Sequence, residues 1–288
     1  LRPGLNAVFG DYDQYPSQYG EIFRTEPSDM AQEIEIEMRM LGLGQLRAEG
    51  APTAVDNGMG QRNITTYVHK YIALSFSITQ AALEDNLYKT KFPLMVRSLK
   101  QSMHQAKEIL GASVLNNAFN AAFPIGDGVA LCAANHPIDG GTVSNLGVAA
   151  DFNEASLEAA LIGVQIFKDA AGLTLMAKPE KVIVAPQGQY AACRLLNSSY
   201  RTNTNTNDIS AVYNLDSVPQ GYRVNQYLTA PAAWFLLTNI EGFKHFVRKS
   251  IETDVYVDFY TDNLLAKAVE RFSFGNSNFR SVWGNPGV

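Results

Sequence analysis

The sequence predicts an α+β protein, and three observations lead to this class. Residues 33–40 and 251–260 alternate apolar and polar side chains with the period of two that is typical of β-strands. Residues 91–120 and 154–170 instead repeat apolar side chains every three or four positions, which is the spacing of an amphipathic helix. The 288 residues are enough for one large domain or two modest ones.

The first 30 residues show neither period. They are rich in Tyr, Pro, Gly and Asp, and aromatic residues are uncommon in disordered tails. We therefore interpret this segment as an irregular arm that lies on another surface. A frayed tail is the alternative.

An extended hairpin is expected next. The strand at 33–40 places Ile34, Ile36, Met38 and Met40 on one face, and we expect the charged face opposite to contact water. A glycine-rich loop at 41–63 and a long strand at 64–79 follow. A loop of about 20 residues is uncommon in a compact domain unless it has a function.

A long helix at 91–120 follows the hairpin and is expected to measure about 45 Å. Pro93 falls in its first turn, where a missing N–H costs nothing. Two helices that are broken near Gly111 are the alternative. The second helix, at 154–170, has Asn153 as its expected N-cap.

The remaining short elements fall largely into one compact unit at residues 125–239. They are a strand at 181–185, a helix at 187–196, a polar tip at 198–210, a strand at 233–238 and, beyond this unit, a final strand at 266–274. The strands after residue 239 are expected to pair with the hairpin and the long helix as a second unit.

Composition excludes several classes of protein. The net charge is −5 and no run of Lys and Arg stands out, which argues against a specific nucleic-acid-binding domain. No apolar run approaches the ~20 residues that span a bilayer, and no signal peptide opens the chain. Cys132 and Cys193 form no metal-binding motif, so we expect two buried free thiols, as in a reducing cytoplasm.

No catalytic motif is recognisable. The four histidines, none of them in a metal-binding pair, are His69, His104, His136 and His245. His136 precedes Pro137, and a general base on a loop is the alternative to a structural turn there. Residues 42–47 partly match a dinucleotide-binding loop but lack the third glycine. We predict no enzyme activity, no cofactor and no metal.

The order of these elements resembles the major capsid fold of tailed bacteriophages, also called the Johnson fold and shared with encapsulins. Within it, the chain is most similar to the Mu-like major head protein family. The resemblance covers about residues 20 to 285, and its most specific stretch is Asn-His-Pro-Ile-Asp-Gly-Gly-Thr-Val-Ser-Asn at 135–145. The other stretches are Glu49-Gly50, residues 71–79, residues 83–86, residues 114–119 and Asp127-Gly128.

The resemblance implies four parts. Residues 1–32 would be an N-terminal arm and 33–70 an extended β-hairpin loop. Residues 71–124 and 240–288 would form a peripheral domain with the long helix as its spine. Residues 125–239 would form an axial domain.

The same resemblance implies where subunits meet. The extended loop would lie across a neighbouring subunit, and its expected contact residues are Gly42, Gly44, Arg47, Glu49, Gly50 and Arg62. The axial domain would carry the motif His136, Pro137, Gly140, Gly141 and Asn145. Some members of this fold join their subunits by a Lys–Asn isopeptide bond. Residues 41–63 contain no Lys, so we expect a non-covalent shell.

The function that follows is that of a major capsid protein. Copies would assemble into hexamers and pentamers of an icosahedral shell that encloses double-stranded phage DNA without reading its sequence. Portal, scaffold and decoration proteins are candidate partners, and a membrane is not. The protein would belong to the virion and assemble in the host bacterial cytoplasm. An encapsulin-type compartment shell is the closest alternative, and an enzyme with an unrecognised site is a second one.

Overall fold

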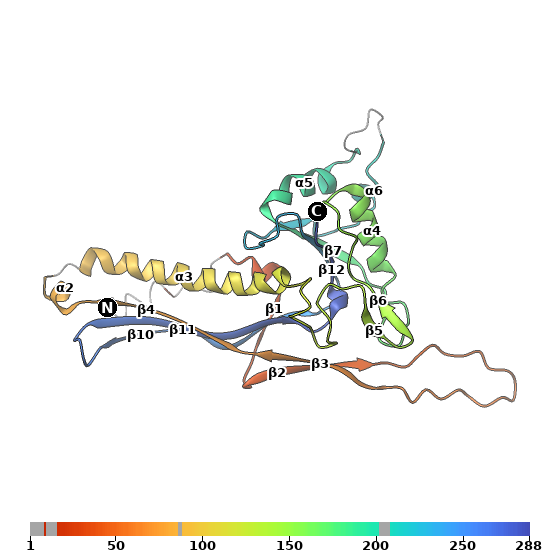
Figure 1. Cartoon of the computed structure of the whole chain (residues 1–288), viewed down its shortest axis with the longest axis horizontal. Coiled ribbons are helices and arrows are strands. Elements are labelled where there is room, and N and C mark those ends of the chain that lie inside the picture. Colours follow the sequence, from red (N-terminus) through yellow and green to blue (C-terminus); the bar gives the residue numbers. More distant parts are fainter. Residues whose placement is uncertain (1–8, 10–15, 86–87, 202–207) are drawn as a thin grey trace. The chain divides into compact units, whose positions relative to one another are not determined.

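The structure is a computed structural model that describes residue 9 and residues 16–85, 88–201 and 208–288 (Figure 1). The chain divides into two compact units. Unit 1 comprises the described residues of Leu1–Glu33, Tyr67–Gly111 and Lys244–Phe274. Unit 2 comprises those of Ile34–Thr66, Ala112–Phe243 and Gly275–Val288. The expected four-part division stays a prediction.

Unit 1 is built on a four-stranded sheet with the order β1-β10-β11-β4. The short strand β1 (Arg24–Pro27) runs parallel to β10 (Phe243–Val257). The strand β11 (Leu264–Asn276) pairs antiparallel with β4 (Lys70–Ile78) over nine residues without a bulge. Residues 24–27 therefore form a strand, and the expectation that residues 1–30 are irregular is wrong for them.

One face of this sheet packs against the long helix α3 (Tyr88–Asn116), which follows the short helix α2 (Gln80–Glu84). The 29 residues of α3 correspond to about 44 Å. Its buried stripe includes Phe92, Val96 and Leu99, which contact the sheet through Ala266 and Ala268. The helix begins three residues earlier than expected, so Pro93 lies inside it rather than in its first turn.

Gly111 does not break α3, and its role is to admit the N-terminal segment. A Cβ atom at Gly111 would lie 2.9 Å from Cβ of Tyr19, in the 3-10 helix η2 (Tyr19–Glu21). The backbone N–H groups of Gln18 and Tyr19 donate to the buried carboxylate of Glu108 at 2.8 and 3.1 Å. This part of the expected arm therefore lies on the chain's own long helix.

Unit 2 contains a second four-stranded sheet, with the order β12-β9-β7-β8. The strand β9 (Trp234–Thr238) pairs antiparallel with β7 (Pro179–Val184) and with β12 (Val282–Asn285). The strand β8 (Tyr222–Val224) runs parallel to β7. Every side chain of β9 is buried, so this strand is central to the core of the unit.

Helices complete this core. They are α4 (Glu154–Gln165), α5 (Gln189–Asn197) and α6 (Ala211–Asn214), with the 3-10 helices η3 (Pro186–Gly188) and η4 (Phe279–Ser281). The Asn153 side chain accepts a hydrogen bond from the N–H of Ser156, and Ser156 accepts one from Asn153 N–H. This capping box confirms the predicted helix start. The helix ends at Gln165, earlier than expected, although Phe167 is still buried in the core.

The extended hairpin consists of β2 (Gln32–Arg39) and β3 (Gly60–Val68), which form a two-stranded sheet. The predicted single strand at 64–79 is interrupted at His69, between β3 and β4. The buried His69 ring lies 3.0 Å from the Ser28 hydroxyl and 3.1 Å from that of Ser273. The strand therefore breaks at a residue whose side chain makes these two contacts.

The two cysteines differ in burial. Cys132 is buried, and burial raises its thiol pKa. Cys193 is exposed on α5, so the expectation of two buried thiols is wrong for it. Both are free, as expected.

Candidate inter-subunit surface

The apolar face of β2 is open to solvent. Ile34, Ile36 and Met38 are 52%, 42% and 44% exposed, whereas the charged residues between them are only partly exposed. The alternation was predicted correctly, but the face that contacts water was assigned the wrong way round. The stripe continues to Met40, which is 61% exposed. We call Ile34, Ile36, Met38 and Met40 the β2 stripe.

The charged face of β2 is turned inward because it has partners within the chain. The Arg280 guanidinium donates from Nη1 to Glu37 Oε1 at 2.8 Å, and the Asn63 amide donates to the other oxygen of Glu37. Arg280 is buried and also donates to the carbonyl of Lys168 at 2.6 Å. A buried guanidinium needs a charge partner, so this pair fixes the orientation of β2.

A second attachment joins both strands of the hairpin to one carboxylate. Arg39 on β2 and Arg62 on β3 both donate to Asp139, the latter from Nη1 to Oδ1 at 2.8 Å. Arg62 also donates to the carbonyl of Ala170 at 2.9 Å. The hydrogen bond from Arg39, and the charges of both arginines, hold the pKa of Asp139 below its ordinary value. Arg62 is thus engaged within its own chain.

Beyond the hairpin, the loop between β2 and β3 makes few contacts with the rest of the chain. Asp56 accepts hydrogen bonds from the N–H groups of Gly42 and Gly58 at 2.7 Å each, and these bonds lower its pKa. Arg47 donates to the Ala51 carbonyl and to the Thr53 hydroxyl, both within the loop.

Three other predicted contact residues are open to solvent. Gly44 and Glu49 are exposed, and Gly50 takes a left-handed φ of 77° in the turn. The loop therefore organises itself locally and leaves its apolar side chains outside. Leu43 is 79% exposed and Leu46 fully so.

The predicted axial motif forms a small hairpin of β5 (His136–Ile138) and β6 (Gly141–Val143). Gly140 has a φ of 76°, which glycine adopts without strain and which permits the tight turn after Asp139. The turn thus presents the Asp139 carboxylate to Arg39 and Arg62. Two sets of residues that the sequence suggested separately, the loop and the axial motif, meet at this carboxylate.

A buried polar network fixes the base of the β5–β6 hairpin. The Asn145 amide nitrogen donates to the carbonyls of Leu131, Phe279 and Val282 at 2.7–3.1 Å. Its oxygen therefore faces the His136 Nε2 at 3.0 Å and accepts a hydrogen bond from it. The His136 ring is fully buried and stacks on Phe279 with 3.9 Å between the ring centroids.

The other ring nitrogen of His136 has a carboxylate partner. Its Nδ1 lies 2.6 Å from Oδ2 of Asp127, which is itself almost completely buried. No substrate reaches a ring so enclosed, so His136 acts as a structural residue and not as a general base on a loop. Pro137 follows it within β5.

Four residues of this site were not predicted as functional, namely Glu37, Arg39, Asp139 and Arg280. The sequence contains one signal for them. Charged and apolar residues alternate over residues 33–39, so the charged residues share one face of the strand. If every charged side chain has a partner within the chain, this charged face turns inward. Their partners lie up to 243 positions away, and a strand pattern does not identify them.

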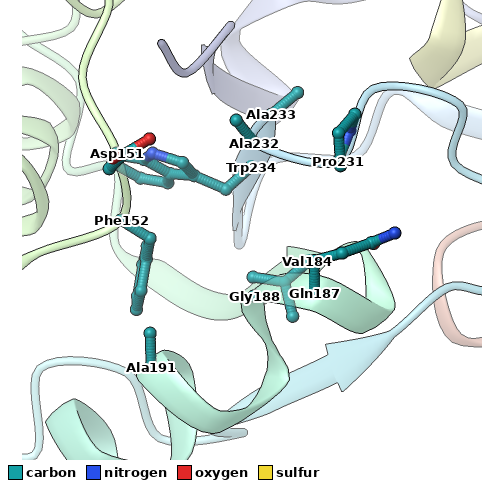
Figure 2. A pocket seen from close by; sticks show the side chains of 10 residues that line it. All are labelled: Asp151, Phe152, Val184, Gln187, Gly188, Ala191, Pro231, Ala232, Ala233 and Trp234. Atoms are coloured by element: carbon teal, nitrogen blue, oxygen red, sulfur yellow. The ribbon is translucent and has the colours of Figure 1, made fainter.

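A surface pocket of about 420 Å³ also lies in unit 2 (Figure 2). Its walls include Phe152, Gln187 and Trp234, and Asp151 is the only ionisable side chain among its lining residues. The Trp234 N–H donates to the Ala150 carbonyl at 3.3 Å. The pocket thus has no pair of groups for acid–base or nucleophilic chemistry.

Two further searches of the described residues bear on function. Residues 16–85, 88–201 and 208–288 contain no group of three or more His, Cys, Asp and Glu side chains placed to hold a metal ion. No helix in this part of the chain is long and apolar enough to cross a membrane.

Comparison with known proteins decides the family. The sequence profile of the family described as phage capsid protein matches residues 63–285, well over half of the chain. The chain belongs to this family of phage capsid proteins. The match includes most of β3, the long helix α3, the β5–β6 hairpin, the sheet of unit 2 and, except for β1, the sheet of unit 1 of this capsid protein. Whether it is closest to the Mu-like major head proteins stays a prediction.

Solved structures show the same fold at low sequence identity. The virus-like particle subunit from Pyrococcus furiosus is 11% identical with a TM-score of 0.58, and 98% of each chain is covered. The capsid subunit of bacteriophage JBD30 is 13% identical with a TM-score of 0.51, covering 93% of this chain and 64% of that one. The SrpI encapsulin from Synechococcus elongatus is 9% identical with a TM-score of 0.56, covering 95% and 89%.

No curated protein sequence matches this capsid protein significantly. The major capsid fold predicted from the order of elements is confirmed by the family and by these structures.

Proposed function

We propose that this capsid protein assembles with copies of itself, as hexamers and pentamers, into an icosahedral shell around double-stranded DNA. The observation that carries the proposal is the β2 stripe, an apolar face left in solvent on a strand whose charged face is satisfied inside the chain. Burial of apolar area is the main favourable term in association. A surface of this kind therefore favours contact with another molecule.

The loop next to the stripe extends the proposed contact. Leu43 and Leu46 add exposed apolar area, and Gly42, Gly44, Arg47, Glu49 and Gly50 lie beside them. Arg62 contributes indirectly, because its pairing with Asp139 holds the hairpin in place. Residues 41–63 contain no Lys, which supports a shell without Lys–Asn isopeptide bonds in this loop.

The remaining parts of the proposal rest on composition and on the family. A net charge of −5 without a basic cluster suits a wall that encloses DNA without gripping it. We propose that the protein is not an enzyme and acts as a component of the virion after assembly in the host bacterial cytoplasm. Portal, scaffold and decoration proteins are its expected partners.

An encapsulin-type compartment shell is the second candidate. It is favoured by similarity to the SrpI encapsulin, whose TM-score of 0.56 exceeds the 0.51 of the JBD30 capsid. The two functions differ in what the shell encloses. Particles isolated from the natural source would contain double-stranded DNA under the first proposal and protein cargo under the second.

The test is electron microscopy of the full chain and of a variant that lacks residues 43–61. The full chain is expected to form closed particles. The deletion variant is expected to fold, because the loop contributes little to either core, but not to close a shell. A full chain that remains a monomer at high concentration would overturn the proposal, and intact particles from the deletion variant would overturn the role of the loop.

A further inference from the structure

Residues 18–28, which we call the N-terminal strap, contact a group of buried ionisable side chains in unit 1. The strap comprises Gln18, the 3-10 helix η2, the strand β1 and the residues between and after them. The ionisable side chains are each at most 9% exposed and are those of His104, Lys107, Glu108, His245 and Glu270. Burying an ionisable group is costly unless a partner compensates it, so the partner of each group decides how it responds to pH.

Four of these five groups have a partner that suits their charge. Lys107 on α3 forms an ion pair with Glu270 on β11. Glu108 accepts hydrogen bonds from two backbone N–H groups of the strap, at 2.8 and 3.1 Å. The His104 Nε2 lies 3.7 Å from Oε1 of Glu108, one helical turn away on α3.

The fifth group, His245 on β10, is surrounded by aromatic rings and a hydroxyl. Its Nδ1 lies 3.1 Å from the Thr25 hydroxyl, and its Nε2 is buried without a hydrogen-bond partner among the described residues. The ring stacks on Phe274 with 4.3 Å between centroids and meets the Tyr19 ring edge-on at 5.2 Å. Burial, followed by the charge of Lys107, lowers the pKa of His245 to about 3. The imidazole is therefore neutral at pH 7.

The elements packed against His245 offer little compensation for a positive charge on it. The helix α3 brings Lys107, which repels such a charge, and His104 and Glu108, which face each other. The strand β11 brings Glu270, which is engaged by Lys107. A protonated His245 would thus be a second buried cation beside the first.

The carboxylates of the strap itself point elsewhere. Glu26 follows Thr25 along β1, so its side chain lies on the opposite face of the strand. There it forms ion pairs with Arg24 at 3.3 Å and with Lys244 at 3.7 Å. Glu21 of η2 is exposed to solvent. The strap therefore covers the His245 ring with uncharged groups.

The strap is attached by a short element that can detach without breaking the sheet. The strand β1 has four residues and lies at one end of the described strand order, paired with β10. Beyond it, the Ser28 N–H donates to the Val247 carbonyl at 2.9 Å. Short elements with few contacts open at a low free energy. Once Thr25 and Tyr19 move away, water can hydrate a charged ring.

His69 also contacts the strap, but its surroundings differ. Burial and the charge of Arg271 lower its pKa, whereas the charge of Glu33 raises it. The Ser28 hydroxyl lies 3.0 Å from the His69 ring and donates to Glu33 at 2.5 Å, so a carboxylate lies close to this histidine. Protonation is therefore better tolerated at His69 than at His245.

We infer that the N-terminal strap detaches from unit 1 when His245 takes up a proton. The neutral ring holds the strap through Thr25 and Tyr19, and the protonated ring favours the open state in which water replaces them. The inference goes beyond the proposed function and does not depend on it, because every group involved lies within one chain.

Hydrogen exchange on the full-length, unassembled chain tests the inference, with rates expressed as protection relative to the intrinsic rate at each pH. In the detached state His245 regains its ordinary pKa of about 6.5. The strap contribution is therefore complete above pH 6.5 and is lost as pH falls towards 3. Protection of residues 19–27 is expected to fall at least tenfold from pH 7 to pH 5. Protection of β9, in the core of unit 2, is expected to change far less.

Two matched variants identify the group that responds. His245→Asn keeps a polar group for Thr25 but takes up no proton in this range, so protection of the strap should fall less than about threefold. His104→Gln, at another buried histidine of unit 1, should keep the tenfold loss. Wild-type protection that persists at pH 5, or the same loss in His245→Asn, would overturn the inference.

A titration of the unmodified protein decides the case if His245→Asn does not fold or leaves the strap detached at every pH. Imidazole signals of His245 in nuclear magnetic resonance report its protonation, and amide signals of residues 19–27 report the attachment. Both are expected to change together as pH falls. A His245 ring that becomes protonated while the strap amides stay protected would overturn the inference.

Discussion

The strands β2, which belongs to unit 2 from Ile34 onward, and β9, which lies wholly in unit 2, place their apolar side chains in opposite environments. All five side chains of β9 are buried. On β2 the apolar side chains are the exposed ones, and the charged side chains have partners within the chain. The difference teaches that alternation identifies two unlike faces of a strand, whereas the partner that each face finds decides which one is covered.

The surroundings of the two strands explain the contrast. β9 lies between β7 and β12, and its side chains contribute to a core that includes α4. β2 has β3 as its one strand partner in the described chain. A two-stranded ribbon is marginally stable alone. Its ion pairs with Arg280 and Asp139 hold it in place and leave the β2 stripe for another molecule.

The buried strand offers the largest effect. Leu236→Ala in β9 removes a fully buried side chain, so the free energy of unfolding should fall by about 2–5 kcal/mol. Leu46→Ala, at a fully exposed position in the loop, is the control and should change it by less than about 0.5 kcal/mol. Urea denaturation of dissociated subunits measures both. Equal losses would remove the distinction between core and loop.

A substitution in the polar base of the β5–β6 hairpin should lower the free energy of unfolding nearly as much. Asn145→Ala leaves the carbonyls of Leu131, Phe279 and Val282 without their side-chain donor, at a cost of about 3 kcal/mol. Asn153→Ala removes only a helix cap, so it should cost about 1 kcal/mol. The same denaturation experiment ranks the two. If Asn145→Ala lowered the free energy of unfolding no more than Asn153→Ala does, this would contradict a supporting role for the network.

The Asp139 carboxylate, which holds the β2–β3 hairpin, is half exposed, so its effect on overall stability should be small. Asp139→Asn should change the free energy of unfolding little, because solvent screens exposed pairs. It should nevertheless speed hydrogen exchange in β2 and β3, since Arg39 and Arg62 lose their shared partner. Asp56→Asn, which removes loop contacts alone, is the control. Unchanged exchange in Asp139→Asn would show that Asp139 does not hold the hairpin.

The pH dependence of this attachment follows from the lowered pKa of Asp139. The folded chain binds this proton less readily than the unfolded chain does, so the contribution is complete above the ordinary aspartate pKa of about 3.9. It is lost as pH falls through the lower folded value. The hairpin should therefore stay attached at neutral pH and loosen only in strong acid. Loosening between pH 6 and 8 would contradict this assignment.

Local signals in the sequence predicted much of the fold. The start of α4 at Asn153 is set by neighbouring residues, and it was predicted correctly. The long helix was predicted from its apolar spacing as one continuous helix, and it continues through Gly111. The contact of Gly111 with Tyr19 was not predicted, because the two residues lie far apart in the sequence. The strands β1 and β12 were missed, since each is short and depends on partners far along the chain.

The candidate site was predictable only in part. The resemblance singled out residues 135–145, but the β5–β6 hairpin was not predicted, and the buried contacts of His136 with Asp127 and Asn145 come from the folded core. The orientation of β2 was assigned wrongly because Arg280 and Asp139, which attract its charged face, lie in distant segments. Long-range charge partners of this kind decide which face of a strand is covered, and strand periodicity does not contain them.

The most direct measurement combines Ile34→Ser, Ile36→Ser and Met38→Ser in one chain and follows both stability and assembly. The side chains are already exposed, so urea denaturation of dissociated subunits should shift by less than about 0.5 kcal/mol per site. Ile162→Ser, at an exposed apolar position on α4, serves as the control and should still form particles in sedimentation velocity. The triple variant is expected to sediment as folded, unassembled subunits, whereas a normal yield of closed particles would contradict the assignment of the β2 stripe as an inter-subunit surface.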